Sequence, residues 1–186
     1  GGREIGKKLA EEFGIDFYDK ELITLAAKES GYSEEILKEN DENHNGSFLY
    51  SLVMGTYTGG DSLPLNHKLF LAQFDTIKKL AAEKSCVIIG RCADYALEYD
   101  PDCVKVFIHA DFDSRVKRAI EQYGDNPDKA EETVKKTDKK RESYYNFYTG
   151  KKWGNMENYD LTINSTFSGI DGAVRVIADL VRDKMK

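Results

Sequence analysis

The sequence of 186 residues contains few of the residue types that build disulfide frameworks or metal centres. It has three cysteines and three histidines. The cysteines form no C-x-x-C pair and are odd in number, so we expect neither a disulfide framework nor a metal site. Cys86 and Cys103 begin apolar runs and are interpreted as buried thiols. This cysteine usage is typical of a reducing, cytoplasmic setting.

Long apolar runs are also absent. No stretch approaches the roughly eighteen residues that a membrane-spanning helix needs, so we expect no membrane partner. Hydrophobic residues make up 40% of the chain and charged residues 32%, which is typical of a globular rather than a disordered protein. The length fits one domain over residues 1–186, with ample apolar material for a core.

An excess of basic residues is the third feature that the chain lacks. Its formal net charge is −6, which argues against a nucleic-acid binder. Residues 135–152 are the exception, because they hold seven basic and two acidic side chains, a local charge of +5 against −11 elsewhere. This stretch is either a solvated helix face or a basic flap that closes on a small, highly charged anion.

Hydrophobic periodicity predicts alternating strands and helices. Apolar runs predict strands at 15–19, 86–90, 103–110 and 159–165. Helical spacing predicts helices at 3–13, 20–31, 33–40, 68–85, 92–98, 113–124, 128–148 and 169–185. Residues 41–67 lack a clean period and are predicted to form a loop-rich insertion. Alternation of this kind indicates an α/β fold with a parallel sheet covered on both faces.

Several polar residues directly follow the predicted strands. Ligands of parallel sheets bind beyond the carboxyl ends of the strands, so these residues are site candidates. Arg91 is the most informative of them, because an arginine after a buried strand and a glycine is hard to explain by packing. The other candidates are Asp19, Lys20, Gly90, Asp111, Asn164 and Ser165.

The first fourteen residues, GGREIGKKLAEEFG, place a glycine pair directly before an amphipathic helix. Such a turn can hold phosphate, because free backbone amides and the helix dipole point at the anion. A turn of this kind normally follows a strand, and none precedes Gly1 in the sequence. The glycines are therefore either a leader left by tag removal or the end of a phosphate-binding loop.

Five segments together resemble the cytidylate-kinase-like branch of the P-loop nucleoside monophosphate kinases. They are GGREIGKKLAEEFGIDFYDKELI, VIIGRCADYAL, VKVFIHADFDSRVKRAIEQYG, KKTDKKRESYYNFYTGKKWG and YDLTINSTFSGIDGAV. The resemblance implies a three-layer α/β/α P-loop NTPase fold with a parallel sheet, an acceptor-binding insertion at 41–67 and a basic lid at 125–158. It also implies that the first strand and part of the phosphate loop are absent from the given chain, and it favours the loop origin of the glycines.

The resemblance further implies an ATP-dependent phosphotransferase. Such an enzyme moves the γ-phosphoryl group of ATP to a nucleoside monophosphate, CMP or dCMP first, with Mg²⁺ as the metal cofactor. Its partners would be small-molecule nucleotides and not nucleic acid. Two alternatives stay open: a degenerate P-loop protein that binds a nucleotide without turnover, and a P-loop kinase with a different small-molecule acceptor.

The resemblance also assigns roles to individual residues. It places Gly1, Gly2, Arg3 and Glu4 at the donor phosphates, and Asp19, Arg91 and Asp94 at the acceptor nucleotide. It places Arg3, Arg115, Arg118 and Arg141 around the transferred phosphoryl group, where positive charge is worth most at the transition state.

The sequence departs from the family pattern at three positions. Arg3 stands where a P-loop has lysine, Glu4 where it has serine or threonine, and Cys92 where cytidylate kinases carry an acid that Asp94 could replace. Simpler roles also stay open: Asp19 could cap the next helix, and Arg115 and Arg118 could be solvated. The aromatic run YYNFY at 144–148 could stack on a base, but we favour its docking on the core.

Overall fold

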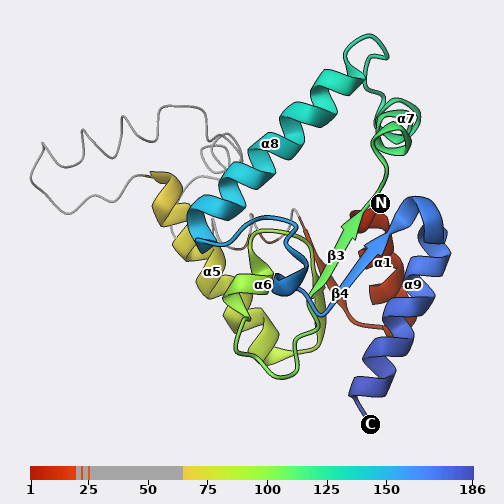
Figure 1. Ribbon diagram of the computed structural model, residues 1–186. Coiled ribbons are helices and arrows are strands. Elements are labelled where there is room, and N and C mark those ends of the chain that lie inside the picture. Colours follow the sequence, from red (N-terminus) through yellow and green to blue (C-terminus); the bar gives the residue numbers. More distant parts are fainter. Residues whose placement is uncertain (20–21, 23–24, 26–64) are drawn as a thin grey trace, which may run out of the picture.

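The computed structural model describes residues 1–19, 22, 25 and 65–186 (Figure 1). Three predicted segments lie wholly or mostly outside the described residues: most of the helix at 20–31, the helix at 33–40, and nearly all of the insertion at 41–67. Within the described part, Leu22 and Leu25 are helical, and the side chain of Leu22 is fully buried.

The first helix forms because its apolar residues recur on one side. Helix α1 spans Gly2–Phe13 and buries Ile5 and Leu9. It ends at Gly14, which adopts the left-handed conformation (φ 62°) that glycine reaches without strain. The chain then enters strand β1, Asp16–Tyr18.

The other elements follow the predicted order. Each strand and helix predicted within the described ranges is present, and the strands are shorter than their apolar runs. The elements are α5 (Leu65–Glu83), β2 (Cys86–Ile88), α6 (Ala93–Ala96), β3 (Val106–His109), α7 (Phe112–Tyr123), α8 (Ala130–Thr149), the 3₁₀ turn η1 (Met156–Asn158), β4 (Leu161–Asn164) and α9 (Ser165–Lys184).

The strands pair in parallel, which confirms the α/β fold with parallel sheets. Strand β1 pairs with β2, with Asp16 opposite Cys86. Strand β3 pairs with β4, with His109 opposite Asn164. Both pairs join strands that are distant in sequence, as crossover connections require. Among the described residues, the pairing is two separate two-stranded ladders.

Two hydrophobic clusters place helices against the strands from different sides. Helices α1 and α9 pack together on side chains of β2, β3 and β4, around Ile5 and Ile163. Helices α5 and α6 pack on β1 and β2, around Ile77 and Leu80. In Figure 1, α1 and α9 lie beside β3 and β4, and the long helix α8 runs from α5 toward α7.

The expectation that Cys86 and Cys103 are buried thiols is wrong. Both are only partly buried, and the buried cysteine is Cys92, which is 4% exposed. Cys86 begins strand β2 directly after the exposed residues Lys84 and Ser85, so its position at the element's end leaves it within reach of solvent.

Gly6 allows α1 to approach the strands closely, and we expect Gly6→Val to destabilise the protein by about 1–3 kcal/mol through overpacking. A β-carbon there would lie 2.5 Å from Cδ1 of Ile89 and 3.3 Å from side-chain atoms of Phe17 and Val87. Urea denaturation measures the change in the free energy of unfolding.

Gly172→Ala in α9 is the matched control. Its β-carbon would lie 3.5 Å from the β-carbon of Ser168, which is an ordinary van der Waals contact. Alanine inside a helix should stabilise the protein by up to about 1 kcal/mol. Equal stability of Gly6→Val and wild type would contradict the close approach of α1 to the strands.

Candidate functional site

The start of α1 and one face of α7 form the first group of predicted site residues. No side chain among the described residues caps the start of α1, and the first helical bond there runs from the Ile5 amide to the Gly1 carbonyl (3.0 Å). The first backbone amides of a helix have no partner within it, and they carry partial positive charge. Arg118 of α7 forms an ion pair with Glu4, within the first turn of α1. The structure thus brings a guanidinium from α7 to the positive end of α1.

Arg3 and Asp19 also meet, in an ion pair between α1 and the residue after β1. The Asp19 side chain is mostly buried, whereas that of Arg3 is largely exposed. The structure therefore gives the Asp19 carboxylate a partner in the first turn of α1.

Arg115 lies one turn before Arg118 on α7 but turns to a different partner. One terminal nitrogen of its guanidinium donates to both carboxylate oxygens of Asp138 on α8, at 2.8 and 2.7 Å. Its Nε is buried and has no hydrogen-bond partner among the described residues. The bonds between Arg115 and Asp138 therefore join α7 to α8.

Arg141 is exposed on α8, and no ion pair joins it to another residue in the part of the chain that the structure describes. Arg115 and Arg118, by contrast, both line a space next to Gly1, at the start of α1. Two of the four arginines predicted at the phosphoryl group therefore lie at one point.

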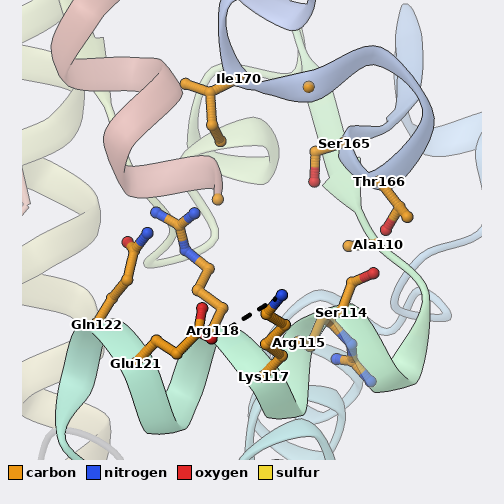
Figure 2. Close-up of a pocket in the computed structure, with 12 residues that line it drawn as sticks. Ala110, Ser114, Arg115, Lys117, Arg118, Glu121, Gln122, Ser165, Thr166 and Ile170 are labelled. Atoms are coloured by element: carbon orange, nitrogen blue, oxygen red, sulfur yellow. Dashed lines mark ion pairs between the residues drawn. The ribbon is translucent and has the colours of Figure 1, made fainter.

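A pocket of about 260 Å³ opens at that point. Figure 2 shows the Arg118 side chain reaching from α7 toward the start of α1, with Ser165 and Thr166 on the opposite wall. The pocket is lined by Gly1, Ala110, Ser114, Arg115, Lys117, Arg118, Glu121, Gln122, Ser165, Thr166, Gly169 and Ile170. It therefore combines cationic, hydroxyl and apolar groups beyond the carboxyl ends of β3 and β4.

Hydrogen bonds between the two strand ends hold this wall in place. The Asp111 amide donates to Oγ1 of Thr166 (2.9 Å), and the Asn164 side-chain amide donates to Oδ1 of Asp111 (3.0 Å). Asn164 also caps α9 by accepting from the Thr166 amide (2.9 Å). The Ser165 hydroxyl donates to the His109 carbonyl (3.0 Å). Asp111 and Asn164, both flagged by their positions after strands, thus support the wall.

Arg91 and Asp94 form a second group, at the end of β2. Gly90, Arg91 and Cys92 all have positive φ, at 73°, 58° and 55°, which is rare for residues other than glycine. Asp94 accepts a 2.6 Å hydrogen bond from the Tyr145 hydroxyl of α8. Its carboxylate therefore has a partner within the protein.

The aromatic run at 144–148 docks α8 onto α5, as expected. Tyr145 and Tyr148 are buried, and the Tyr148 ring stacks on Phe70 with centroids 4.1 Å apart. The Tyr148 hydroxyl donates to the Asn66 carbonyl (3.0 Å). A second pocket, of about 330 Å³, lies beside this contact and is lined by His67, Phe70, Leu71, Phe74, Tyr95, Phe147 and Tyr148.

The sequence predicted only part of the first pocket. Ser165 was a candidate because it follows a strand, and the arginines of α7 were candidates because of the family resemblance. Gln122 and Ile170 carried no signal, because an exposed glutamine and an isoleucine have many ordinary roles. Ile170 reaches the pocket because the backbone of α9 is kinked at Gly169 (φ 66°, ψ 175°).

Neither a metal cluster nor a membrane span is found in the part of the chain that the structure describes. No group of three or more histidine, cysteine, aspartate or glutamate residues there is placed to hold a metal ion. No helix among the same residues is both long and apolar enough to cross a membrane.

The ionisation of Asp94 should make stability depend on pH. Burial raises the pKa of the Asp94 carboxyl, and the Tyr145 hydrogen bond opposes this shift. The folded protein therefore binds this proton more tightly than the unfolded chain, and ionised Asp94 costs stability as the pH rises above the ordinary carboxyl pKa. Asp94→Asn removes this cost. The free energy of unfolding of Asp94→Asn, minus that of wild type, should therefore be larger at about pH 7 than at about pH 4. Urea denaturation of both proteins at both pH values measures this difference. A difference that is the same at the two pH values, or smaller at pH 7, would contradict the prediction.

Together, these features define a mixed α/β protein whose parallel strands end at a cationic pocket. A sequence model of the cytidylate kinase-like family matches residues 1–167. The chain therefore belongs to the cytidylate kinase-like family.

A solved structure resembles the whole chain. It is the crystal structure of an uncharacterized protein from Eubacterium ventriosum, which is 29% identical in sequence and has a TM-score of 0.71. The match covers 98% of this chain and 91% of that one. No curated protein matches this chain. The family supports a nucleotide-kinase-like function, and the structural relative supports the fold.

Proposed function

We propose that this protein is a nucleotide kinase that transfers the γ-phosphoryl group of ATP to a nucleoside monophosphate, with CMP or dCMP as the first candidates. The observation that carries the proposal is the pocket at the start of α1, which Arg115, Lys117 and Arg118 line together with Gly1. Backbone amides, a helix dipole and several guanidinium groups together favour a polyanion. The family supports a nucleotide as that polyanion.

The donor nucleotide would occupy the first pocket. Its phosphates would lie at the first turn of α1, near Arg118 and Lys117, and its nucleoside would extend along the wall that contains Ser165 and Ile170. That wall offers hydroxyl groups and an apolar surface, which suit a ribose and a base.

The acceptor would bind at the end of β2, where Arg91 lies. A guanidinium can hold a phosphate through two parallel hydrogen bonds. Asp19, also predicted at the acceptor, follows β1, the strand that pairs with β2. The two residues therefore follow neighbouring parallel strands, whose carboxyl ends share one edge.

Phosphoryl transfer suits this set of residues, because it needs positioning and positive charge more than a protein nucleophile. Charge spreads over the oxygens of the transferred group in the transition state, and preorganised cations stabilise that charge. Arg141 and Arg118 would supply this stabilisation from α8 and α7. Arg115, paired with Asp138, would hold the two helices together.

Mg²⁺ would fit this site only with help from the nucleotide. The nearby carboxylates Glu4 and Asp19 already have arginine partners. Proteins commonly bind Mg²⁺ through one or two carboxylates and the phosphates of the substrate. The bound metal would supply further positive charge at the phosphates, and Glu4 or Asp19 could each provide an oxygen ligand by releasing its arginine.

The affinity for a non-hydrolysable ATP analogue, measured by isothermal titration calorimetry, tests this placement. Arg118→Gln removes a cation from the pocket and leaves the Glu4 carboxylate unpaired beside the phosphates. We expect the dissociation constant to rise at least about tenfold, as for the loss of one charged hydrogen bond. Arg175→Gln, on the exposed side of α9, is the control and should change it less than about twofold. Equal affinities of Arg118→Gln and wild type would contradict the placement.

A nucleotide sensor without turnover is the second candidate, and two ion pairs favour it. Arg3 is paired with Asp19, and Arg118 is paired with Glu4, so two of the cations near the start of α1 are already neutralised by carboxylates of the same chain. Such pairs would weaken the stabilisation of a transition state more than the binding of a nucleotide. ATP binding without ADP formation, in the presence of any nucleoside monophosphate, would favour the sensor.

A further inference from the structure

We propose that Asp94 is a positioning residue that, through Tyr145, fixes helix α8 and its Arg141 relative to the loop that carries Arg91. The structural part of this inference stands on hydrogen bonds and burial. Its consequence for catalysis rests on the kinase function proposed above. Nucleotide binding by the Asp94 carboxylate stays a prediction from the sequence, and the contact with Tyr145 gives this carboxylate a role within the protein.

The loop before α6 has a conformation that needs external support. Arg91 and Cys92 both have φ values in the left-handed region, which is unfavourable for residues other than glycine. Such strain persists only where the surrounding structure determines it. The backbone of the loop is closed by hydrogen bonds from the Ala93 amide to the Gly90 carbonyl (3.1 Å) and from the Ala96 amide to the Cys92 carbonyl (2.9 Å).

Helix α8 supplies part of that support. The Cys92 side chain is buried in a cluster with Phe70, Tyr145 and Tyr148. Two of these three partners belong to α8. A shift of α8 would therefore uncover Cys92 and remove contacts that hold the loop in its strained conformation.

The hydrogen bond between Tyr145 and Asp94 fixes how α8 is oriented on this cluster, because a hydrogen bond is directional and apolar packing is not. Tyr145 is 5% exposed, and its hydroxyl donates to Oδ2 of Asp94 over 2.6 Å. A bond to a carboxylate in a water-poor environment is stronger than a neutral one at the surface. Asp94 belongs to α6 and Tyr145 to α8, so this bond joins the two helices directly.

The spacing along α8 connects this bond to Arg141. Asp138, Arg141 and Tyr145 are three and four residues apart, so they lie on one face of the helix. Asp138 is bonded to Arg115 of α7, and Tyr145 to Asp94 of α6. Arg141 thus lies between two anchored positions. Because a helix is stiff over two turns, fixing both positions fixes the direction in which Arg141 projects.

Tyr145→Phe tests the inference, because it removes one hydroxyl and keeps the ring in the cluster. Amide hydrogen exchange at Ala93, Tyr95 and Ala96 reports on the loop without any ligand. We expect exchange about tenfold faster than in wild type, as for the loss of one charge-assisted hydrogen bond. Tyr144→Phe is the matched control: it lies on the same helix, but its hydroxyl donates to Gln73 (3.3 Å), and it should leave these amides unchanged.

Variants of Asp94 separate positioning from ligand binding. Asp94→Asn keeps an acceptor for the Tyr145 hydroxyl but loses the charge of the carboxylate, so its exchange should lie between that of wild type and that of Tyr145→Phe. Asp94→Leu should behave as Tyr145→Phe does, with faster exchange, a KM for CMP about tenfold higher and a lower kcat. Combining Asp94→Leu with Tyr145→Phe should add little to either change alone.

The outcomes distinguish this inference from the proposed function. Unchanged exchange in Tyr145→Phe, or equal changes in Tyr144→Phe, would overturn the link between α8 and the loop. Faster exchange with unaltered KM and kcat would overturn its role in catalysis. If wild type neither binds nor phosphorylates any nucleoside monophosphate, the proposed function fails, and the exchange measurement still decides the structural link.

Discussion

Replacing Arg141 with methionine is expected to lower kcat by about 10²–10³-fold, the range for the loss of one preorganised group that stabilises a transition state. Arg141 is exposed, and no ion pair joins it to another described residue. It lies on the same face of α8 as Asp138, which is bonded to Arg115 of the first pocket. Methionine keeps a long, flexible side chain of high helix propensity, so α8 should remain folded. Steady-state kinetics on the full-length protein measure the effect.

Lys139→Met is the matched control for Arg141→Met. Lys139 is also exposed on α8, but it lies two residues away and therefore on another face of the helix. Lys139→Met removes the same net charge as Arg141→Met. The kcat of Lys139→Met should stay within about threefold of wild type, as expected for a distant, screened surface charge. A similar, small loss in both variants would show that Arg141 acts only through overall charge and would contradict its proposed role.

Replacing Arg91 with alanine is expected to raise the KM for the nucleoside monophosphate by about 100-fold. The loss of two hydrogen bonds between a guanidinium and a phosphate accounts for that magnitude. Alanine keeps the β-carbon, so the left-handed backbone at φ 58° is no more strained than in wild type. The affinity for ATP should not change, because the donor would bind at the start of α1.

Arg91→Lys provides the control for charge alone. Lysine keeps the positive charge but lacks the planar fork that binds phosphate through two bonds. Its KM for the acceptor should therefore fall between those of wild type and Arg91→Ala. A wild-type KM in Arg91→Ala, with an unchanged unfolding curve, would place the acceptor elsewhere.

The sequence predicted the secondary structure well, because each element carries a local signal. The run CVIIG forms β2, and the spacing of Ile5 and Leu9 forms the buried side of α1. Parallel pairing followed from the alternation of strands and helices. The register did not, because the pairing of Asp16 with Cys86 joins residues 70 positions apart in the sequence.

The candidate site was predictable only in part. The positions of Asp19, Arg91 and Ser165 directly after strands identified them as candidates, and the family resemblance identified the arginines of α7 and α8. The partners of these side chains were not predictable, because ion pairs and hydrogen bonds depend on which residues, distant in sequence, lie close together in the fold. Arg118 and Glu4, 114 residues apart, form an ion pair, and Asp94 meets Tyr145 of α8 rather than solvent.

The measurement that tests the central claim most directly is ADP formation from Mg-ATP by the full-length protein against a panel of nucleoside monophosphates, with CMP and dCMP first. The account predicts ADP that depends on one acceptor, with that acceptor recovered as its diphosphate. No ADP above the acceptor-free rate for any member of the panel, with ATP binding shown separately, would contradict the kinase function and favour the nucleotide sensor.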